Sequence, residues 1–256
     1  MSSISPLTID DMRTIFREEI GALNGRVLSI RESGRRLYCR ATLPLLGEVA
    51  PGDRVRGGVA LRAAEPDALV CPYVLRILCV NGLIVRRSLE AHDLKGLAHL
   101  PTAAADWTLR EAIRTSCAEE AFNLAVEEMR AARRRRIERL IHAMDRHLRR
   151  DITGGADLLP GVMDRFDEEN DRSAFGLMNA VTALARDTAD PELRWQLEAL
   201  GGAIADGSLA TPPTRGDRFP QLVRRELLRE SVRRRGESEE VNPRAREQPC
   251  QVDSLA

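Results

Sequence analysis

Hydrophobic residues near the N-terminus first repeat at helical spacing. The apolar positions within residues 8–24 are Met12, Ile15, Phe16, Ile20 and Leu23. This spacing predicts a short amphipathic helix, for which Thr8 and Asp10 are the candidate caps. Asn24-Gly25 then predicts the end of the helix, because both residues accept the backbone conformations that terminate one.

The pattern next changes to short runs rich in β-forming residues. These predicted strands cover residues 27–32, 35–43 and 55–61. Ser33-Gly34 joins the first two as a hairpin, and turn residues at 51–53 and 65–67 bound the third. We interpret Gly57-Gly58 within the third strand as a β-bulge.

The most hydrophobic part of the chain, residues 69–85, is interrupted once, at Asn81-Gly82. Asn-Gly is the strongest two-residue hairpin signal, since both positions accept a positive φ. The pattern therefore predicts two paired central strands over 73–80 and 83–87. A helix over 73–79 remains an alternative, because a short continuous apolar run does not distinguish the two by periodicity.

From Trp107 onward the apolar period is helical. Residues 108–150 contain neither glycine nor proline, which predicts one helix of roughly 40 residues, or two in line, ending at Gly154-Gly155. Two more helices follow, over 173–186 and from Asp190-Pro191 to about Gly201-Gly202, which we interpret as a helix stop.

These elements predict an α+β fold, with an antiparallel β-rich N-terminal core followed by a long helix and a helical C-terminal part. We expect one α+β domain over 1–207, β-rich at 26–87 and helical at 108–205. Residues 208–235 are predicted to form a linker and a basic helix. Residues 236–256 are polar and nearly free of aliphatic side chains, which predicts a disordered tail.

Composition fits an ordinary globular protein, with 43% hydrophobic and 30% charged residues among 256. The five cysteines are odd in number and scattered without a C-x-x-C pair, so neither a disulfide framework nor a zinc site is indicated. No signal peptide and no apolar run of membrane-spanning length is present. We therefore expect a cytoplasmic protein with no membrane partner.

Positive charge is concentrated in one segment of the chain. The net charge of the protein is zero, but residues 130–150 contain nine arginines and only two acidic residues, Glu138 and Asp145. The candidate nucleic-acid-binding residues are Arg130, Arg133, Arg134, Arg135, Arg136 and Arg139. Guanidiniums that neutralise phosphates would bind DNA or RNA in a salt-dependent way. The alternative is a solvated helix face balanced by the acidic residues within 164–171. Few aromatic residues are available to stack on single strands.

Catalytic and metal-binding signatures are missing from the sequence. Cys71, Cys79, His92 and His99 lack the short spacings that hold zinc. No phosphate-binding loop, dinucleotide-binding glycine motif or nucleophile elbow is present. We therefore predict no enzymatic activity, no cofactor and no metal.

Two short motifs resemble a known family. Residues 75–83, LRILCVNGL, are followed by His92, and residues 175–187 read FGLMNAVTALARD. In order and spacing these stretches resemble a phage/plasmid-like family of unknown function (domain of unknown function 932), over about residues 50–205. The chain departs from that family at residues 63–67. The resemblance implies a bacterial mobile-element setting and supplies no established activity and no catalytic residues.

The polar residues of the two motifs allow two interpretations. They could line a common polar site made of Arg76, Asn81, His92, Asn179 and Thr182. They could instead be structural, with Asn81-Gly82 setting a turn and Asn179 and Thr182 tying a helix to a strand end.

The sequence thus predicts an accessory protein of a mobile element that binds nucleic acid through its arginine-rich helix. The alternative is a non-enzymatic protein-interaction module in which the long helix assembles with a second copy of the chain, as a homo-oligomer, or with an acidic partner.

Overall fold

The computed structural model describes residues 7–86, 88–169 and 171–210. The predicted basic helix and tail from residue 211 lie outside the described residues, and the side chain of Arg139 also lies outside them. The described part forms one unit with an α+β fold, as expected.

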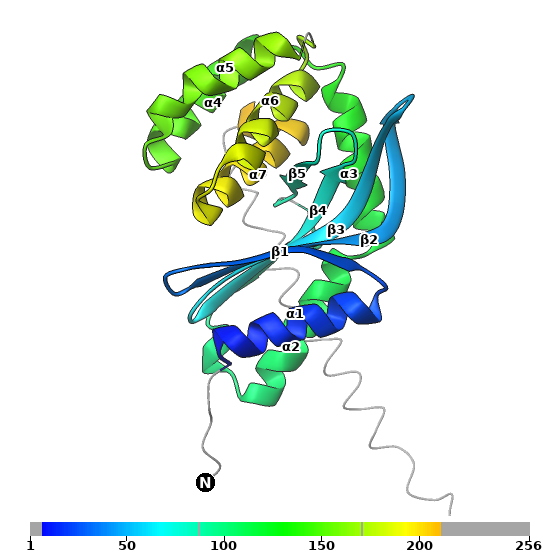
Figure 1. The fold of residues 1–256 in the computed structure, drawn as a ribbon, viewed down its shortest axis with the longest axis vertical. Helices are drawn as coiled ribbons and strands as arrows, with labels where there is room; N and C mark the ends of the chain where they lie inside the picture. The colour runs from blue at the N-terminus through cyan, green and yellow to red at the C-terminus, as the bar shows by residue number, and fades with distance from the viewer. Residues whose placement is uncertain (1–6, 87, 170, 211–256) are drawn as a thin grey trace, which may run out of the picture. The chain divides into compact units, whose positions relative to one another are not determined.

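An antiparallel sheet forms the centre of this unit (Figure 1). Its strands are β1 (Arg26–Ser33), β2 (Arg36–Ala50), β3 (Asp53–Ala64), β4 (Asp67–Arg76), β5 (Asn81–Ile84) and β6 (His92–Leu94). The order is β1-β2-β3-β4-β5, and β6 also pairs with β4. β6 pairs with the beginning of β4 and β5 with its end. The three predicted strands of residues 27–61 and their turns are confirmed.

Within the described residues, seven α-helices and three 3-10 turns accompany the sheet. The helices are α1 (Ile9–Ala22), α2 (Thr102–Ser116), α3 (Glu119–Ala132), α4 (Glu138–Asp151), α5 (Leu158–Glu168), α6 (Ala174–Asp187) and α7 (Pro191–Ala205). The 3-10 turns are η1 (Leu97–His99), η2 (Gly155–Asp157) and η3 (Ser208–Ala210). Thr8 and Asp11 form a reciprocal capping box at the start of α1, and Asp190 caps α7 ahead of Pro191. The predicted caps Thr8 and Asp190 are confirmed, whereas Asp10 lies inside α1 and pairs with Arg13 instead of capping the helix.

One face of the sheet carries helices at both of its ends. Val59 and Leu61 of β3 pack with α1 and α2, whereas Val55, on the same face of β3, packs with α3. Between these ends, the pairing of β2 with β3 shifts register between Thr42 and Leu46. A bulge of this kind bends a sheet. The extra residues lie in β2, opposite Gly57, so the glycine pair of β3 faces the bulge and does not form it, contrary to the prediction from the sequence.

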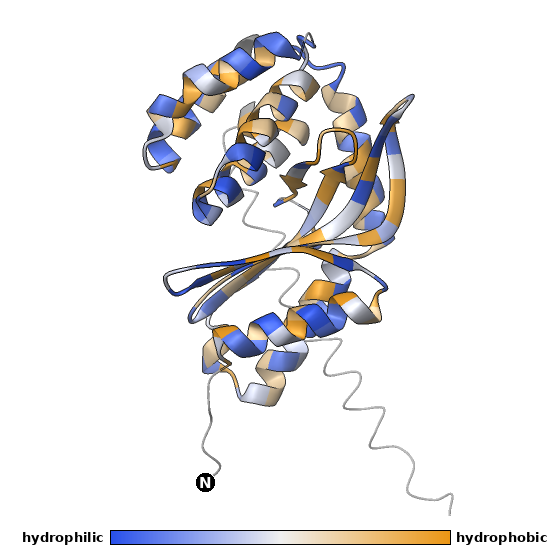
Figure 2. Cartoon of the chain, in the orientation of Figure 1, coloured by the Kyte–Doolittle hydropathy of each residue, from blue (hydrophilic) through white to orange (hydrophobic). Residues whose placement is uncertain are grey.

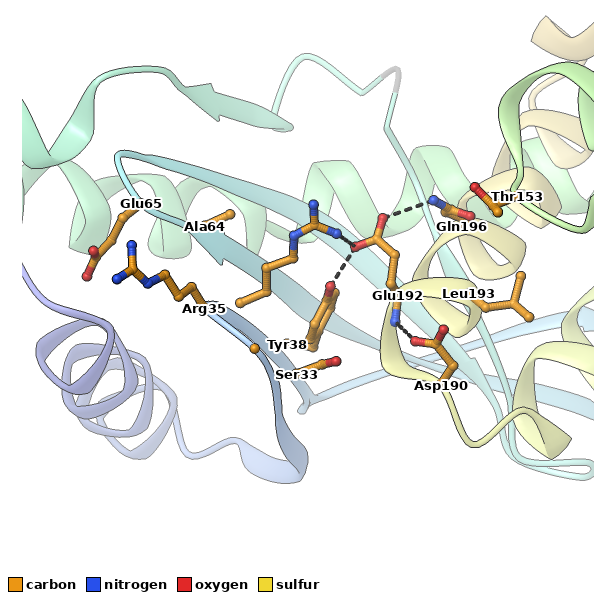
Figure 3. Close-up of a pocket in the computed structure, with 12 residues that line it drawn as sticks. Ser33, Arg35, Tyr38, Ala64, Glu65, Thr153, Asp190, Glu192, Leu193 and Gln196 are labelled. Carbon is orange, nitrogen blue, oxygen red and sulfur yellow. Dashed lines mark hydrogen bonds and ion pairs between the residues drawn. The ribbon is translucent and has the colours of Figure 1, made fainter.

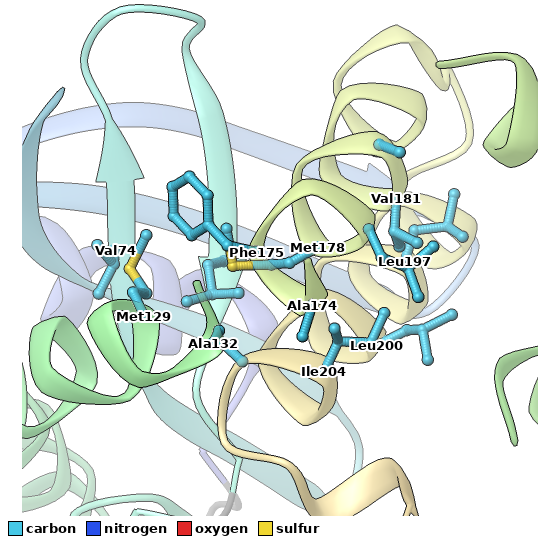
Figure 4. Packing of buried hydrophobic residues seen from close by; sticks show 14 of the residues in the cluster. Val74, Met129, Ala132, Ala174, Phe175, Met178, Val181, Leu197, Leu200 and Ile204 are labelled. Atoms are coloured by element: carbon cyan, nitrogen blue, oxygen red, sulfur yellow. The ribbon is translucent and has the colours of Figure 1, made fainter. Parts of the chain in front are cut away.

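The opposite face of the sheet is covered by α7. Trp195 of α7 packs there against Tyr38 and Tyr73, which come from β2 and β4. Beyond the sheet edge, α6 and α7 pack against each other and against α3 in the largest apolar cluster (Figure 4). Phe175 of α6 belongs to this cluster, which brings the start of α6 close to β4 and α3.

The predicted long helix over 108–150 is divided into three helices. α2 ends at Ser116 and α3 at Ala132, although no glycine or proline lies at either break. The reason is tertiary: α2 and α3 pack on the two ends of one bent sheet face, which a straight helix cannot follow. The second break creates an irregular segment, residues 133–137, before α4.

Two other local predictions are wrong. The turn between β4 and β5 is residues 77–80, while Asn81 is already paired with Arg76 as the first residue of β5. The alternative of a helix over 73–79 is also excluded, because β4 runs to Arg76. Gly201-Gly202 does not end its helix, since α7 continues to Ala205.

Across the described part of the chain, no helix is both long and apolar enough to cross a membrane.

Candidate functional site

The arginine-rich turn between α3 and α4, residues 133–136, is here called the basic turn. Its backbone is fixed to the start of α6, because the Ala174 amide donates to the Arg135 carbonyl at 3.0 Å and Arg136 forms a bridge with Ser173. Arg133, Arg134 and Arg136 are exposed. None of these three forms an ion pair with a carboxylate of the described residues.

The other predicted arginines of this region are engaged elsewhere. Arg130 pairs with Glu127 at 2.6 Å and donates to the Glu48 carbonyl. Arg135 is half-buried, and its Nη2 donates to the carbonyl of Ala205 at the end of α7. Of the six predicted nucleic-acid-binding arginines, three are exposed without a carboxylate partner among the described residues, two bind other parts of the fold, and Arg139 lies outside the described side chains.

Among the described residues, no acidic side chain within 164–171 forms an ion pair with the basic turn, although Asp171 accepts a hydrogen bond from the Ser173 amide beside it. Asp167 pairs with Arg172 rather than with the basic turn. Asp164, Glu168 and Glu169 instead line a cleft of about 710 Å³ beside α6. No group of three or more histidine, cysteine or acidic side chains in the described residues could hold a metal ion.

The two motifs of the family resemblance meet in space, although about 100 residues separate them. Arg186 of α6 donates from Nη1 to the Cys79 carbonyl at 2.9 Å and to Asn81 Oδ1 at 3.4 Å. The guanidiniums of Arg76 and Arg133 lie 5.3 and 5.2 Å from the centre of the Phe175 ring. Phe175 thus links the first motif, the second motif and the basic turn, by cation–π contacts of the kind that orient guanidiniums.

The predicted polar site is brought together only in part. Arg76 and Asn81 pair across β4 and β5, and α6, which carries Asn179 and Thr182, packs against β5. His92 lies apart: β6 pairs it with Val70, six residues before Arg76, which is about 20 Å along a strand. The prediction that His92 shares one polar site with Arg76 and Asn81 is therefore wrong.

The two motif residues of the predicted polar site on α6, Asn179 and Thr182, are buried. The Thr182 hydroxyl donates to the Met178 carbonyl one turn earlier, at 3.0 Å, instead of reaching a strand end. Asn179 is 1% exposed, and its Oδ1 has no hydrogen-bond partner among the described residues. Asn81 alone of the five polar residues lines the cleft beside α6.

A second cavity, of about 700 Å³, lies between the β1–β2 hairpin and α7 (Figure 3). Its central carboxylate, Glu192, accepts a hydrogen bond from Tyr38 at 2.5 Å. Each of the two carboxylate oxygens also accepts a hydrogen bond from Arg62, at 3.0 Å. Gln196 and Arg36 also donate to Glu192. The polar groups at the centre of this cavity hydrogen-bond to one another. Fewer of their donors and acceptors therefore remain for a ligand than at the basic turn, whose exposed arginines have no carboxylate partner among the described residues.

The exposed turn between β4 and β5 was missed by sequence reasoning. Residues 77–80 form a continuous hydrophobic loop, drawn in orange in Figure 2, where the pattern predicted buried strand. Leu78 and Val80 are 75% and 58% exposed. Periodicity contains no signal for this exposure, since a run of apolar residues is typical of buried strands.

Beneath the basic turn, Arg135 lies near two carboxyl groups. Burial, and to a lesser extent the charge of Asp206, raise the pKa of Glu128 to about 7, although the charge of Arg135 opposes this shift. Burial also lowers the pKa of Arg135. Glu128, the carboxyl group near Arg135 at the base of the basic turn, therefore titrates near neutral pH.

This shift predicts a pH-dependent effect of Glu128→Gln. The folded-state pKa lies above the unfolded value, so folding stability decreases as the pH rises from about 4.5 to about 7. We expect Glu128→Gln to raise the free energy of unfolding by about 1 kcal/mol at pH 8 and to change it little at pH 5. Urea denaturation at both pH values measures this difference.

Glu127→Gln is the matched control, because Glu127 lies on the same helix with 66% of its side chain exposed. We expect this control to change stability by less than about 0.5 kcal/mol at either pH. A Glu128→Gln effect of equal size at pH 5 and pH 8 would contradict the titration.

Comparison with protein-family models finds no matching family, and comparisons with curated proteins and with solved structures find no match either. What the protein does must therefore be inferred from its own residues and their geometry.

Proposed function

We propose that this protein binds nucleic acid through the basic turn, with Arg133, Arg134 and Arg136 as the phosphate-contacting residues. One observation carries the proposal: these three side chains are exposed and have no carboxylate partner in the described part of a chain whose net charge is zero. Guanidiniums of this kind suit phosphate oxygens, which they bind through a planar fork of donors.

The contrast with other arginines of the fold supports this choice. Arg110 and Arg114 pair with Glu19, and Arg62 pairs with Glu192. Arginines that hold the fold together thus have acidic partners close at hand. The exposed arginines of the basic turn have no carboxylate partner among the described residues, while its backbone and Arg135 are fixed. Binding a polyanion would therefore cost little conformational entropy.

The setting that we propose is that of an accessory protein of a mobile element, as the resemblance of the two motifs implies. The alternative function, assembly with a second copy of the chain or with an acidic partner, would have to use three shorter helices, because residues 102–151 contain three helices and two breaks. We propose no catalytic step and no cofactor.

Replacing Arg133, Arg134 and Arg136 together by alanine tests the proposal. We expect the full-length wild-type chain to bind a fluorescein-labelled 20-base-pair duplex at about 50 mM salt and to weaken steeply by about 200 mM. The triple variant should bind about 30-fold more weakly at 50 mM, and the slope of log affinity against log salt should fall by about 2 to 3. Fluorescence anisotropy measures both quantities.

The control is a charge-matched triple variant on the other side of the protein, Arg17→Ala, Arg26→Ala and Arg31→Ala. These arginines are also exposed, and they lie on α1 and β1. We expect this control to retain affinity within about threefold, since only non-specific long-range attraction is lost. Absence of wild-type binding to double- or single-stranded DNA or RNA at 50 mM salt, or equal losses in the two triple variants, would refute the proposal.

A further inference from the structure

A cleft of about 710 Å³, lined by residues of α5, α6 and β5, is here called the acidic cleft. α5 and α6 pack against each other (Figure 1). α5 contributes Asp164 and Glu168, and Glu169 directly follows its last residue. None of these three carboxylates forms an ion pair within the described part of the chain. Asp164 and Glu168 lie four residues apart on one helix face, where like charges repel each other, so the fold retains them at a cost to its own stability.

The arginines that line the acidic cleft are already engaged. Arg165 and Arg186 both pair with Asp187, at 3.1 and 2.9 Å. Arg165 also donates to the Gly161 carbonyl at 3.0 Å, and Arg186 donates to the Cys79 carbonyl at 2.9 Å. These contacts use the two guanidiniums within the fold, and the three carboxylates remain without a cationic partner. The acidic cleft therefore presents an excess of negative charge to a ligand.

Asn81 is a second and independent sign of a ligand in the acidic cleft. It lines the cleft and is only 3% exposed. Arg186 donates to its Oδ1 at 3.4 Å, and because a guanidinium has donors only, this contact fixes the orientation of the amide. Its Nδ2 is left without a hydrogen-bond partner among the described residues. A buried donor without an acceptor is unfavourable, and an oxygen atom of a ligand would remove that cost.

The ligand that fits the acidic cleft needs positive charge for the carboxylates and an acceptor for Asn81. A metal ion does not fit, because no group of three or more histidine, cysteine or acidic side chains in the described residues could hold one. A polyamine supplies positive charge but no acceptor. A peptide that contains arginine supplies both, since its guanidinium binds carboxylates through paired donors and its backbone carries carbonyl oxygens. The volume of the cleft also lies within the range of about 300–1,000 Å³ that is typical of ligand sites.

We propose that the acidic cleft binds an arginine-containing segment of a partner protein. A guanidinium of this segment pairs with Asp164 and Glu168, and a backbone carbonyl accepts the hydrogen bond that Asn81 Nδ2 has to offer. The inference goes beyond the proposed function and does not depend on it. The carboxylates of the acidic cleft repel the phosphates that the basic turn would bind, so the two surfaces take ligands of opposite charge.

Isothermal titration calorimetry of the full-length chain with the capped pentapeptide acetyl-RARAR-amide tests this inference. Spermidine is the charge-matched comparison, because both ligands carry three positive charges and only the peptide has carbonyl acceptors. We expect the peptide to bind with a Kd of about 10 μM at about 50 mM salt. Spermidine should bind about tenfold more weakly, since it leaves the buried donor of Asn81 without an acceptor.

The double variant Asp164→Asn, Glu168→Gln should weaken peptide binding about tenfold, because two ion pairs with the ligand are lost. Both residues are at the surface of α5, Asp164 and Glu168 being exposed, so the fold tolerates the change. Glu111→Gln with Glu120→Gln is the matched control. These two glutamates are exposed on α2 and α3 and form no ion pair among the described residues, so their replacement should keep the peptide affinity within about twofold.

Asn81→Asp separates the hydrogen bond from the charge. This variant keeps an oxygen for Arg186, replaces the Nδ2 donor by an acceptor and makes the acidic cleft more negative. We expect the peptide to bind about fivefold more weakly, because its carbonyl now meets a carboxylate oxygen, whereas spermidine should bind as tightly as before or more tightly. Circular dichroism checks that the variant is folded.

Three results would overturn the inference. The first is no peptide binding at about 1 mM peptide, or equal losses in the acidic-cleft variant and its control. The second is an Asn81→Asp protein that binds peptide and spermidine more tightly alike, because charge alone would then govern binding. The third is self-association of the chain that Asp164→Asn, Glu168→Gln abolishes, without peptide binding, since this assigns the acidic cleft to a second copy. Each of these results leaves nucleic-acid binding by the basic turn standing.

Discussion

Replacing Glu198 by alanine is expected to lower the free energy of unfolding by about 3–5 kcal/mol. Glu198 of α7 and Arg40 of β2 form an ion pair at 2.6 Å, and each side chain is only 1% exposed. Nη2 of Arg40 already has no hydrogen-bond partner among the described residues. Removing the carboxylate leaves a buried guanidinium without its counter-charge, and a charge desolvated in this way is strongly destabilising.

Arg40→Met should cost less, about 1–2 kcal/mol, although it breaks the same pair. The difference arises because Glu198 also accepts a hydrogen bond from Arg194 at 3.0 Å, and the Arg194 side chain is 28% exposed. The carboxylate therefore keeps one partner when Arg40 is removed, whereas Arg40 keeps no carboxylate partner among the described residues when Glu198 is removed. The double variant Arg40→Met, Glu198→Leu should be more stable than Glu198→Ala alone, because no unpaired charge remains.

Urea denaturation followed by circular dichroism measures all three variants. Glu18→Ala is the control, since Glu18 pairs with Arg110 at 2.8 Å but is 55% exposed, and we expect a change below about 1 kcal/mol. A Glu198→Ala cost no greater than that of Glu18→Ala would show that the buried pair does not hold α7 on the sheet.

Elements whose signals are local could be predicted from the sequence. The capping box at Thr8, the hairpin at Gly34 and the start of α7 at Asp190-Pro191 each depend on a few neighbouring residues. The Arg40–Glu198 pair could not be found in the same way, because 158 residues separate its members. A single arginine between Cys39 and Ala41 gives no sign of where its partner lies.

The breaks in the predicted long helix show the same limit. Residues 108–150 have the composition of a continuous helix, and the break after Ser116 follows from the bent sheet on which α2 and α3 pack. The break after Ala132 is stabilised by partners far along the chain, Ala174 and Ala205. Tertiary contacts of this kind override local propensity, which is a weak preference.

For the candidate site, the sequence could predict which types of residue are present but not how those residues are arranged. Charge concentration identified the arginines of the basic turn, yet only the structure separates the exposed Arg133, Arg134 and Arg136 from the structural Arg135. The resemblance of two short motifs selected the segments that meet at Phe175. It also included His92, which strand pairing places at the other end of β4.

Gly202→Ala is expected to lower the free energy of unfolding by about 3 kcal/mol, because α7 packs directly against the backbone of β5. A Cβ atom at Gly202 would lie 2.0 Å from the carbonyl oxygen of Ile84, and one at Gly201 would lie 2.5 Å from Thr182 Cγ2. Backbone atoms cannot move aside as a flexible side chain does, so the helix itself must shift away from the sheet. Gly21→Ala is the matched control, since nothing lies within 4 Å of its added Cβ on the exposed side of α1, and it should stabilise the protein by up to about 1 kcal/mol. Urea denaturation compares the two variants. Opposite signs would mean that the glycine pair in α7 permits close packing and is not a helix stop, whereas a Gly202→Ala protein as stable as wild type would contradict the contact between α7 and β5.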